Sequence, residues 1–162
     1  MSARHTGGWV IALSLVSALL LTLVPMPAAA QVYRPEWVAL VLIYWCLATP
    51  ERVGVGVAWV MGLLLDVISG ALLGQHALAL ALVAYVALKL HRQARVFPVW
   101  QQAFMVMLLI VMEQMLNLWV QGIIGQPPRS WKYWLPALTS MLLWPWVFLL
   151  LRDLHRRYAA TD

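Results

Sequence analysis

Long uncharged apolar runs, each bounded by charges, proline or glycine, dominate the chain from one end to the other. A helix needs about 20 apolar residues to cross the ~30 Å hydrocarbon core of a bilayer, and several of these runs approach that length. The pattern therefore predicts an all-α polytopic membrane protein with a single integral membrane domain over residues 1–162. Six transmembrane helices are expected, at about residues 9–24, 35–49, 53–69, 72–90, 97–124 and 133–151.

Two of the expected helices are short for a crossing. At 1.5 Å per residue, 35–49 spans about 22 Å and 53–69 about 25 Å, both less than the hydrocarbon core. Either their ends lie a few residues further out, or the helices thin the bilayer, tilt little, or have ends covered by other protein.

Composition narrows the class of protein. Apolar residues make up 64% of the chain and charged residues only 10%, which excludes a soluble enzyme and a disordered tail. A disulfide-stapled secreted domain is excluded as well, because Cys46 is the single cysteine. A membrane protein remains.

Basic residues predict the orientation. Lysine and arginine number 11, and most lie on the side of the bilayer that holds both termini. That side carries Arg4, Arg52, Lys89, Arg92, Arg95, Arg152, Arg156 and Arg157, whereas the other has Arg34, Arg129 and Lys132. Because cytoplasmic loops are enriched in Lys and Arg, we expect a multi-pass membrane protein with both termini in the cytoplasm.

The start of the chain also resembles a signal peptide. Arg4 and His5 precede an apolar stretch, and Ala28, Ala29 and Ala30 form a small-residue site. Cleavage there would remove one crossing and oppose the charge bias, so we favour a retained first helix.

Small residues recur every four positions along the third expected helix and the turn after it. Such a stripe lets a neighbouring backbone approach closely, and the fourth expected helix has small alanine residues at similar spacing. The stripe either packs the third and fourth helices into an antiparallel hairpin, which we favour, or forms a groove for a partner helix. Its members are Gly54, Ala58, Gly62, Asp66, Gly70 and Gly74, and the facing alanines are Ala77, Ala81 and Ala84.

Two carboxylates lie at membrane depth, Asp66 in the stripe and Glu113 in the fifth helix. Glu113 heads a polar row with Asn117 and Gln121, and Gln114 lies beside it. A buried charge must be protonated, paired or hydrated, so these groups either fix the bundle by hydrogen bonds or belong to a proton path, an ion path or an acid pair. We favour the structural interpretation, and nothing in the sequence places Asp66 beside Glu113.

The sixth helix contains Trp144, Pro145 and Trp146 in succession. Proline has no N–H and frees the carbonyl of Met141, so a bend is expected there. With Trp45 and Trp59, these tryptophans would form an aromatic cluster, either as core packing or as a surface for a partner.

Motifs for catalysis, metal binding and phosphate binding are missing from the sequence, and its histidines are scattered among different segments. We therefore expect no enzyme activity, cofactor or metal. The basic clusters at 89–95 and 152–157 adjoin membrane helices, where they orient the chain and attract anionic lipid rather than nucleic acid.

Several stretches together resemble one family, the bacterial rod shape-determining protein MreD, in the form found in Gram-negative proteobacteria. The matching stretches are Tyr33-Arg34-Pro35-Glu36-Trp37, Leu42-Ile43-Tyr44-Trp45, Pro50-Glu51-Arg52-Val53, residues 61–70 with Leu73-Gly74, and Leu143-Trp144-Pro145-Trp146. The order of these motifs agrees over essentially the whole chain.

The resemblance implies a non-catalytic inner-membrane scaffold of the cell-elongation complex. Its partners would be the single-pass protein MreC, the glycosyltransferase RodA, the class B penicillin-binding transpeptidase and, indirectly, MreB, and it would support lateral peptidoglycan synthesis and rod shape. It also implies a fold similar to the substrate-binding membrane subunits of energy-coupling-factor transporters. Asp66, Gly62, Gly70 and Gly74 carry over only as motif positions of structural role, and Glu113 belongs to no family motif.

Two rival functions stay open at this stage. A small-molecule-binding transporter subunit would use a site in the outer half of the membrane, where Asp66, Glu113 and Asn117 gather. An intramembrane enzyme would use the two carboxylates as an acid pair.

Overall fold

The computed structural model describes residues 8–25, 27, 33–70, 73–125 and 131–159. These residues are helical wherever they are regular, which confirms the prediction of an all-helical chain, and no strand occurs among them. The α-helices are α2 (Gly8–Leu23), α4 (Trp37–Ala48), α5 (Val55–Ser69), α6 (Gln75–Val96), α7 (Val99–Ile123) and α8 (Leu135–Ala159), and a 3₁₀ turn at Trp131–Trp134 precedes the last.

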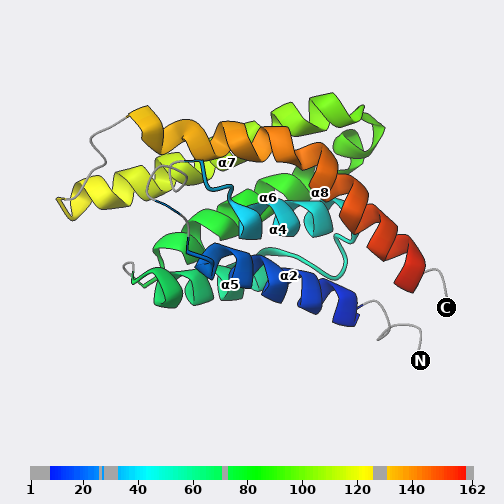
Figure 1. Cartoon of the computed structure of the whole chain (residues 1–162), viewed down its shortest axis with the longest axis horizontal. Coiled ribbons are helices and arrows are strands. Elements are labelled where there is room, and N and C mark those ends of the chain that lie inside the picture. Colours follow the sequence, from blue (N-terminus) through cyan, green and yellow to red (C-terminus); the bar gives the residue numbers. More distant parts are fainter. Residues whose placement is uncertain (1–7, 26, 28–32, 71–72, 126–130, 160–162) are drawn as a thin grey trace.

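The helices lie along one another as a bundle whose members alternate in direction (Figure 1). The beginning of α2 and the end of α8 lie at the same end of the bundle. Contacts join α5 to α6, α6 to α4 and α7, α7 to α8, and α2 to α4. The hairpin expected of the third and fourth helices is thus formed by α5 and α6.

Three helices in the described part are long and apolar enough to cross a membrane, namely α6, α7 and the Leu135–Arg157 stretch of α8. The other three, α2, α4 and α5, are apolar but have 16, 12 and 15 residues. These lengths and compositions indicate a membrane protein.

Helix α4 is the centre of the bundle. Every residue from Val38 to Leu47 is buried, and Leu40, Leu42 and Ile43 have no exposed surface. Neighbours surround it, because α2, α6, α7 and α8 all contact it. Its 12 residues span about 18 Å, so the helix is even shorter than expected. A helix that is apolar all round is stable when protein encloses it, and here other helices cover it.

Two helices end later than the sequence predicted. α6 runs to Val96 rather than residue 90, and α8 to Ala159 rather than 151. The expected ends were placed where the basic residues begin, but positive charges are favourable near a helix C-terminus and do not terminate it. α6 stops only before Phe97 and Pro98, because proline disfavours helical geometry at the preceding residue.

Two arginines counted as topology signals also cap helix ends. The Arg95 guanidinium donates from Nε to the carbonyl of Leu47 (3.1 Å) and from Nη2 to that of Ala48 (3.2 Å) at the end of α4. Arg34 donates to the carbonyls of Thr22 and Val24 at the end of α2. Each supplies donors to carbonyls that a helix end leaves without an intrahelical partner.

The first helix is part of the core. Trp45 in α4 donates its indole N–H to the hydroxyl of Ser14 in α2, at 2.7 Å. Of the residues used in the signal-peptide and orientation arguments, Arg4, His5, Ala28–Ala30 and Arg129 lie outside the described residues.

The expected cluster of four tryptophans does not form. Trp144 is fully buried and Trp45 is 1% exposed, whereas Trp59 and Trp146 are 44% and 72% exposed. The buried pair is joined through other rings: Trp144 packs on Phe148, which contacts Tyr44 beside Trp45. Trp144 and Trp146 are two positions apart, so they point to different sides of α8. α8 contains Pro145 and changes direction part-way along its length (Figure 1).

Candidate functional site

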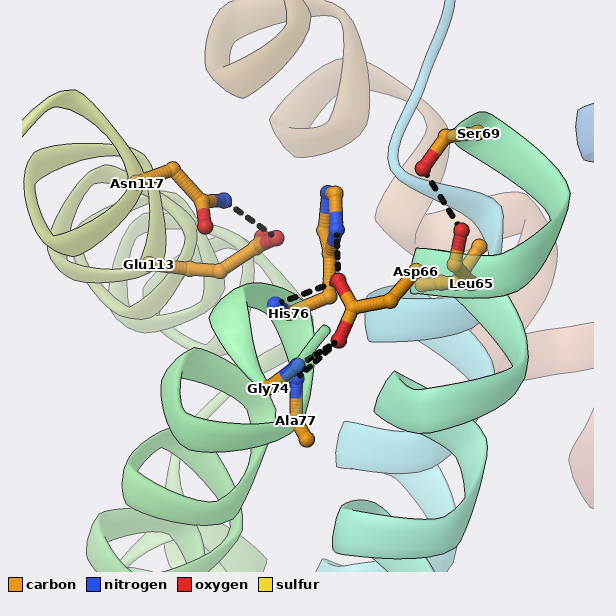
Figure 2. Close-up of polar contacts among 8 residues, drawn as sticks. All are labelled: Leu65, Asp66, Ser69, Gly74, His76, Ala77, Glu113 and Asn117. Atoms are coloured by element: carbon orange, nitrogen blue, oxygen red, sulfur yellow. Dashed lines mark hydrogen bonds and ion pairs between the residues drawn. The ribbon is translucent and has the colours of Figure 1, made fainter. Parts of the chain in front are cut away.

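The carboxylate of Asp66 holds the α5–α6 hairpin closed. It is 1% exposed and accepts hydrogen bonds from the backbone N–H groups of Gly74 and His76, both at 2.8 Å, and from that of Ala77 at 3.5 Å (Figure 2). The ring nitrogen Nδ1 of His76 lies 2.8 Å from the same carboxylate. All of these groups belong to the beginning of α6, where unpaired N–H groups and the helix dipole favour a negative charge.

Gly62 is the point of closest approach in that hairpin. A Cβ atom at this position would lie 2.3 Å from the Ala77 Cα, 2.5 Å from its nitrogen and 2.6 Å from the carbonyl oxygen of His76. All three are backbone atoms, which cannot move aside as the end of a side chain does. Only glycine therefore permits this packing.

Gly70 and Gly74 act differently from Gly62. A Cβ on either would meet nothing within 4 Å, so neither contributes to a packing surface. Their φ angles of 69° and 103° place them in the left-handed region, where Gly70 ends α5 and Gly74 precedes α6. The small-residue stripe is thus one close contact at Gly62 followed by a glycine turn, and its contact face is used inside the chain.

The polar row on α7 is buried but only partly bonded. Glu113, Gln114 and Asn117 are 1%, 2% and 6% exposed. Asn117 donates a hydrogen bond to Glu113 at 3.3 Å. The side-chain amide of Gln114 donates to the backbone carbonyl of Tyr133 (3.0 Å), and the Tyr133 hydroxyl donates to the backbone carbonyl of Gln114 (2.9 Å). One oxygen of each of the three buried side chains, Oε2 of Glu113, Oε1 of Gln114 and Oδ1 of Asn117, has no partner among the described residues.

His76 is the residue that sequence reasoning missed. It lies between the two carboxylates in Figure 2, bonded to Asp66 on one side and facing the Glu113–Asn117 pair on the other. No hydrogen bond or ion pair joins Asp66 directly to Glu113 in the described part of the chain. The available signal was the glycine turn between Asp66 and His76, which returns the chain so that position 76 lies beside position 66.

An apolar groove runs between α2 and α8 on the outside of the bundle, with α4 as its floor. Its volume is about 290 Å³, and we call it the α2–α8 groove. Residues that line it include Leu13, Ser17, Ala18, Val41, Val147 and Leu150. Leu13 and Leu150 are 57% and 62% exposed, so its rim is open to the surroundings.

Comparison with known proteins decides the family. The model of the rod shape-determining protein MreD family matches residues 3–154. The curated rod shape-determining protein MreD of Haemophilus influenzae is 37% identical over 158 residues, which cover 97% of this chain and 98% of that protein. The chain belongs to the MreD family. No solved structure matches it.

MreD proteins are shape-determining proteins and are not a known enzyme family, so membership supports a role in cell shape. The match covers every helix described above, with α8 included up to residue 154. Together with the three helices long enough to cross a bilayer, it places this MreD-family chain among membrane proteins. Among the described residues, no group of three or more His, Cys, Asp or Glu side chains is arranged to hold a metal ion.

Proposed function

We propose that this chain is a non-catalytic scaffold of the bacterial inner membrane, crossing it six times with both termini in the cytoplasm. It binds MreC and acts with RodA, the class B penicillin-binding transpeptidase and, indirectly, MreB in lateral peptidoglycan synthesis. Family membership supports the role in shape, and the alternating helices with both ends at one side of the bundle support the topology.

The observation that carries the binding role is the α2–α8 groove. In lipid, helices associate through close packing rather than through the hydrophobic effect, so a partner helix needs a concave face that includes small residues. The groove has Ser17 and Ala18 on its α2 side, while the small-residue face of α5 is already occupied by α6. We propose that the single membrane helix of MreC binds in this groove.

The test is co-purification of MreC with a variant that fills the groove. Ser17 is exposed and its hydroxyl bonds only to the Leu13 carbonyl of its own helix, so Ser17→Trp occupies the groove without removing a contact between helices. We expect MreC recovery to fall about tenfold, which corresponds to ~1.4 kcal/mol of binding energy.

Val67→Trp is the matched control. Val67 is 70% exposed on α5, away from the groove, and the same bulk there should leave recovery unchanged. Normal recovery with Ser17→Trp and reduced recovery with Val67→Trp would contradict the assignment.

A further inference from the structure

A second cavity lies between α4, α6, α7 and α8, at the end of the bundle where α4 and α6 end and α7 begins. The beginning of α2 and the end of α8 lie at the same end (Figure 1), which is the cytoplasmic end in the topology proposed above. Its volume is about 210 Å³, and unlike the α2–α8 groove it has two arginines in its walls, Arg95 from α6 and Arg152 from α8. We call it the arginine cavity.

The buried side of the arginine cavity is bonded within the protein. Gln102 donates its amide N–H to the Ala94 carbonyl at 2.7 Å, and Trp144 donates its indole N–H to the side-chain oxygen of Gln102 at 3.4 Å. Trp144 and Ala94 have no exposed surface, and Gln102 is 6% exposed. These bonds join α6, α7 and α8, so the cavity has walls that are tied to one another.

Arg95 is held in place but keeps donors for a ligand. As described above, its Nε and Nη2 donate to the carbonyls of Leu47 and Ala48 at the end of α4. A guanidinium has five N–H donors in a rigid fork, and no described residue accepts a hydrogen bond from Nη1 of Arg95. The two bonds to α4 therefore fix the position of the charge without using all of its donors.

Arg152 is positioned by an aromatic ring rather than by a carboxylate. Its guanidinium carbon lies 5.6 Å from the centroid of the Phe148 ring. A cation–π contact uses the flat face of the guanidinium, so the N–H groups along its edge can still donate to an acceptor. The neighbouring Asp153 pairs with Arg157 at 3.1 Å, and no Asp or Glu is among the described residues that line the cavity.

Tyr44 brings the two arginines to one place. Its ring centroid is 5.9 Å from that of Phe148, the ring that holds Arg152. The carbonyls that hold Arg95 belong to residues three and four positions after Tyr44, on the same side of α4. Tyr44 is 4% exposed and lines the cavity, and no described residue accepts a hydrogen bond from its hydroxyl. This hydroxyl is a third donor at the site.

The charge of the arginine cavity is positive whatever the pH, because arginine stays protonated in proteins. The other lining residues are Leu47, Ala48 and Phe148 beside the bonded Gln102 and Trp144, so the charges lie next to an apolar surface. A basic pocket between membrane helices on the cytoplasmic side is the type of site that binds anionic lipid headgroups. Both features favour an anion that belongs to an amphiphile.

We propose that the arginine cavity binds a phosphate group, held by Arg95, Arg152 and the hydroxyl of Tyr44. Guanidinium groups match phosphate in geometry and charge, and the several oxygens of a phosphate suit three separate donor groups better than the two of a carboxylate. Cavities that enclose drug-sized ligands measure ~300–1,000 Å³, so one of about 210 Å³ holds a headgroup and leaves the acyl chains outside. Only the assignment of this end to the cytoplasm rests on the proposed topology.

Two sources carry this group at a membrane surface: an anionic phospholipid and free phosphate. Phosphatidylcholine is the matched control lipid, because its phosphate is accompanied by a positive charge that two arginines repel. The full-length protein, reconstituted in nanodiscs with equal phosphatidylglycerol and phosphatidylcholine, is released and its retained lipids are counted by native mass spectrometry. In discs of phosphatidylcholine alone, thermal stability is measured with inorganic phosphate or with chloride at the same ionic strength.

We expect either about tenfold preferential retention of phosphatidylglycerol, which identifies the lipid, or stabilisation by phosphate and not chloride, which identifies the free anion. Arg152→Gln should abolish the preference. Arg92→Gln is the matched control, because Arg92 is exposed on α6 and does not line the cavity, and it should keep the preference. Tyr44→Phe changes no charge and should still lower the preference about fivefold, since it removes one donor.

Three results would overturn the proposal. The first is equal retention of both lipids together with equal stability in phosphate and chloride. The second is an unchanged preference in Arg152→Gln. The third is an equal loss in Arg92→Gln and Arg152→Gln with no loss in Tyr44→Phe, which is the behaviour of diffuse surface charge without a site. MreC recovery is a separate readout, so failure here leaves the scaffold role standing.

Discussion

The α5–α6 hairpin and the polar face of α7 each contain one buried carboxylate, Asp66 and Glu113, and both residues are 1% exposed. Asp66 accepts three backbone hydrogen bonds and contacts a histidine ring. Glu113 accepts one bond of 3.3 Å, and its second oxygen has no partner in the described part of the chain. Equal burial therefore accompanies very different bonding.

The difference follows from what each carboxylate faces. Asp66 faces the beginning of another helix, where backbone donors are unpaired. Glu113 lies in the middle of α7, whose own N–H groups are used within the helix, so only side chains can reach it. We therefore expect Asp66 to stabilise the fold and Glu113 to contribute little to it.

The largest effect is expected at Gly62. Gly62→Ala places a methyl group against the backbone of α6 and should lower the free energy of unfolding by about 3 kcal/mol or more, because neither helix backbone can give way. Unfolding in mixed micelles, followed by circular dichroism, measures it. Gly56→Ala, where a Cβ meets nothing within 4 Å, is the control and should be neutral or slightly stabilising. Equal effects of the two substitutions would refute the close approach.

Asp66→Asn should have the next largest effect. The amide keeps one acceptor but points its NH₂ group at backbone donors, so about 2–3 kcal/mol of stability is lost. The same unfolding assay measures it, with hydrogen exchange at the beginning of α6 as a local readout. A stability equal to wild type would show that the carboxylate does not hold the hairpin.

Tyr133→Phe tests the α7 side, because Tyr133 in the 3₁₀ turn shares two hydrogen bonds with Gln114 of α7. The substitution removes the hydroxyl donor to the Gln114 carbonyl at 2.9 Å and should cost about 1 kcal/mol, the usual value of one neutral hydrogen bond. The denaturant concentration at the midpoint of unfolding would measure this loss of stability. A loss as large as that of Asp66→Asn would mean that the two regions are equally tightly bonded.

Glu113→Gln should change stability least, by less than about 1 kcal/mol, because the amide keeps the size of the side chain and an acceptor for Asn117, and the second oxygen of Glu113 has no described partner. A loss of stability above ~2 kcal/mol would contradict the difference expected between Glu113 and Asp66.

Cell shape gives a second readout for both carboxylates. If Asp66→Asn and Glu113→Gln cells stay rod-shaped, acid catalysis by the pair is excluded.

The sequence predicted the helices well because length, apolar content and proline or glycine boundaries are local properties. It missed the ends of α6 and α8, where basic residues continue the helix. It placed the end of the third helix at residue 69 correctly, but it counted Gly62, Gly70 and Gly74 in one stripe, because four-residue spacing does not reveal that Gly62 alone of the three meets a neighbouring backbone. It overlooked His76, since contacts across a turn depend on backbone conformation, which spacing alone does not supply.

We propose above that MreC binds in the α2–α8 groove, while the small-residue face of α5 is used inside the chain. Disulfide crosslinking in cells tests it directly, from single cysteines at Leu150 in the groove and at Val67 on α5, which are 62% and 70% exposed. The native Cys46 is fully buried and can remain. Paired with cysteines along the MreC membrane helix, Leu150→Cys should form crosslinks and Val67→Cys none. Crosslinks from Val67→Cys alone would contradict the account.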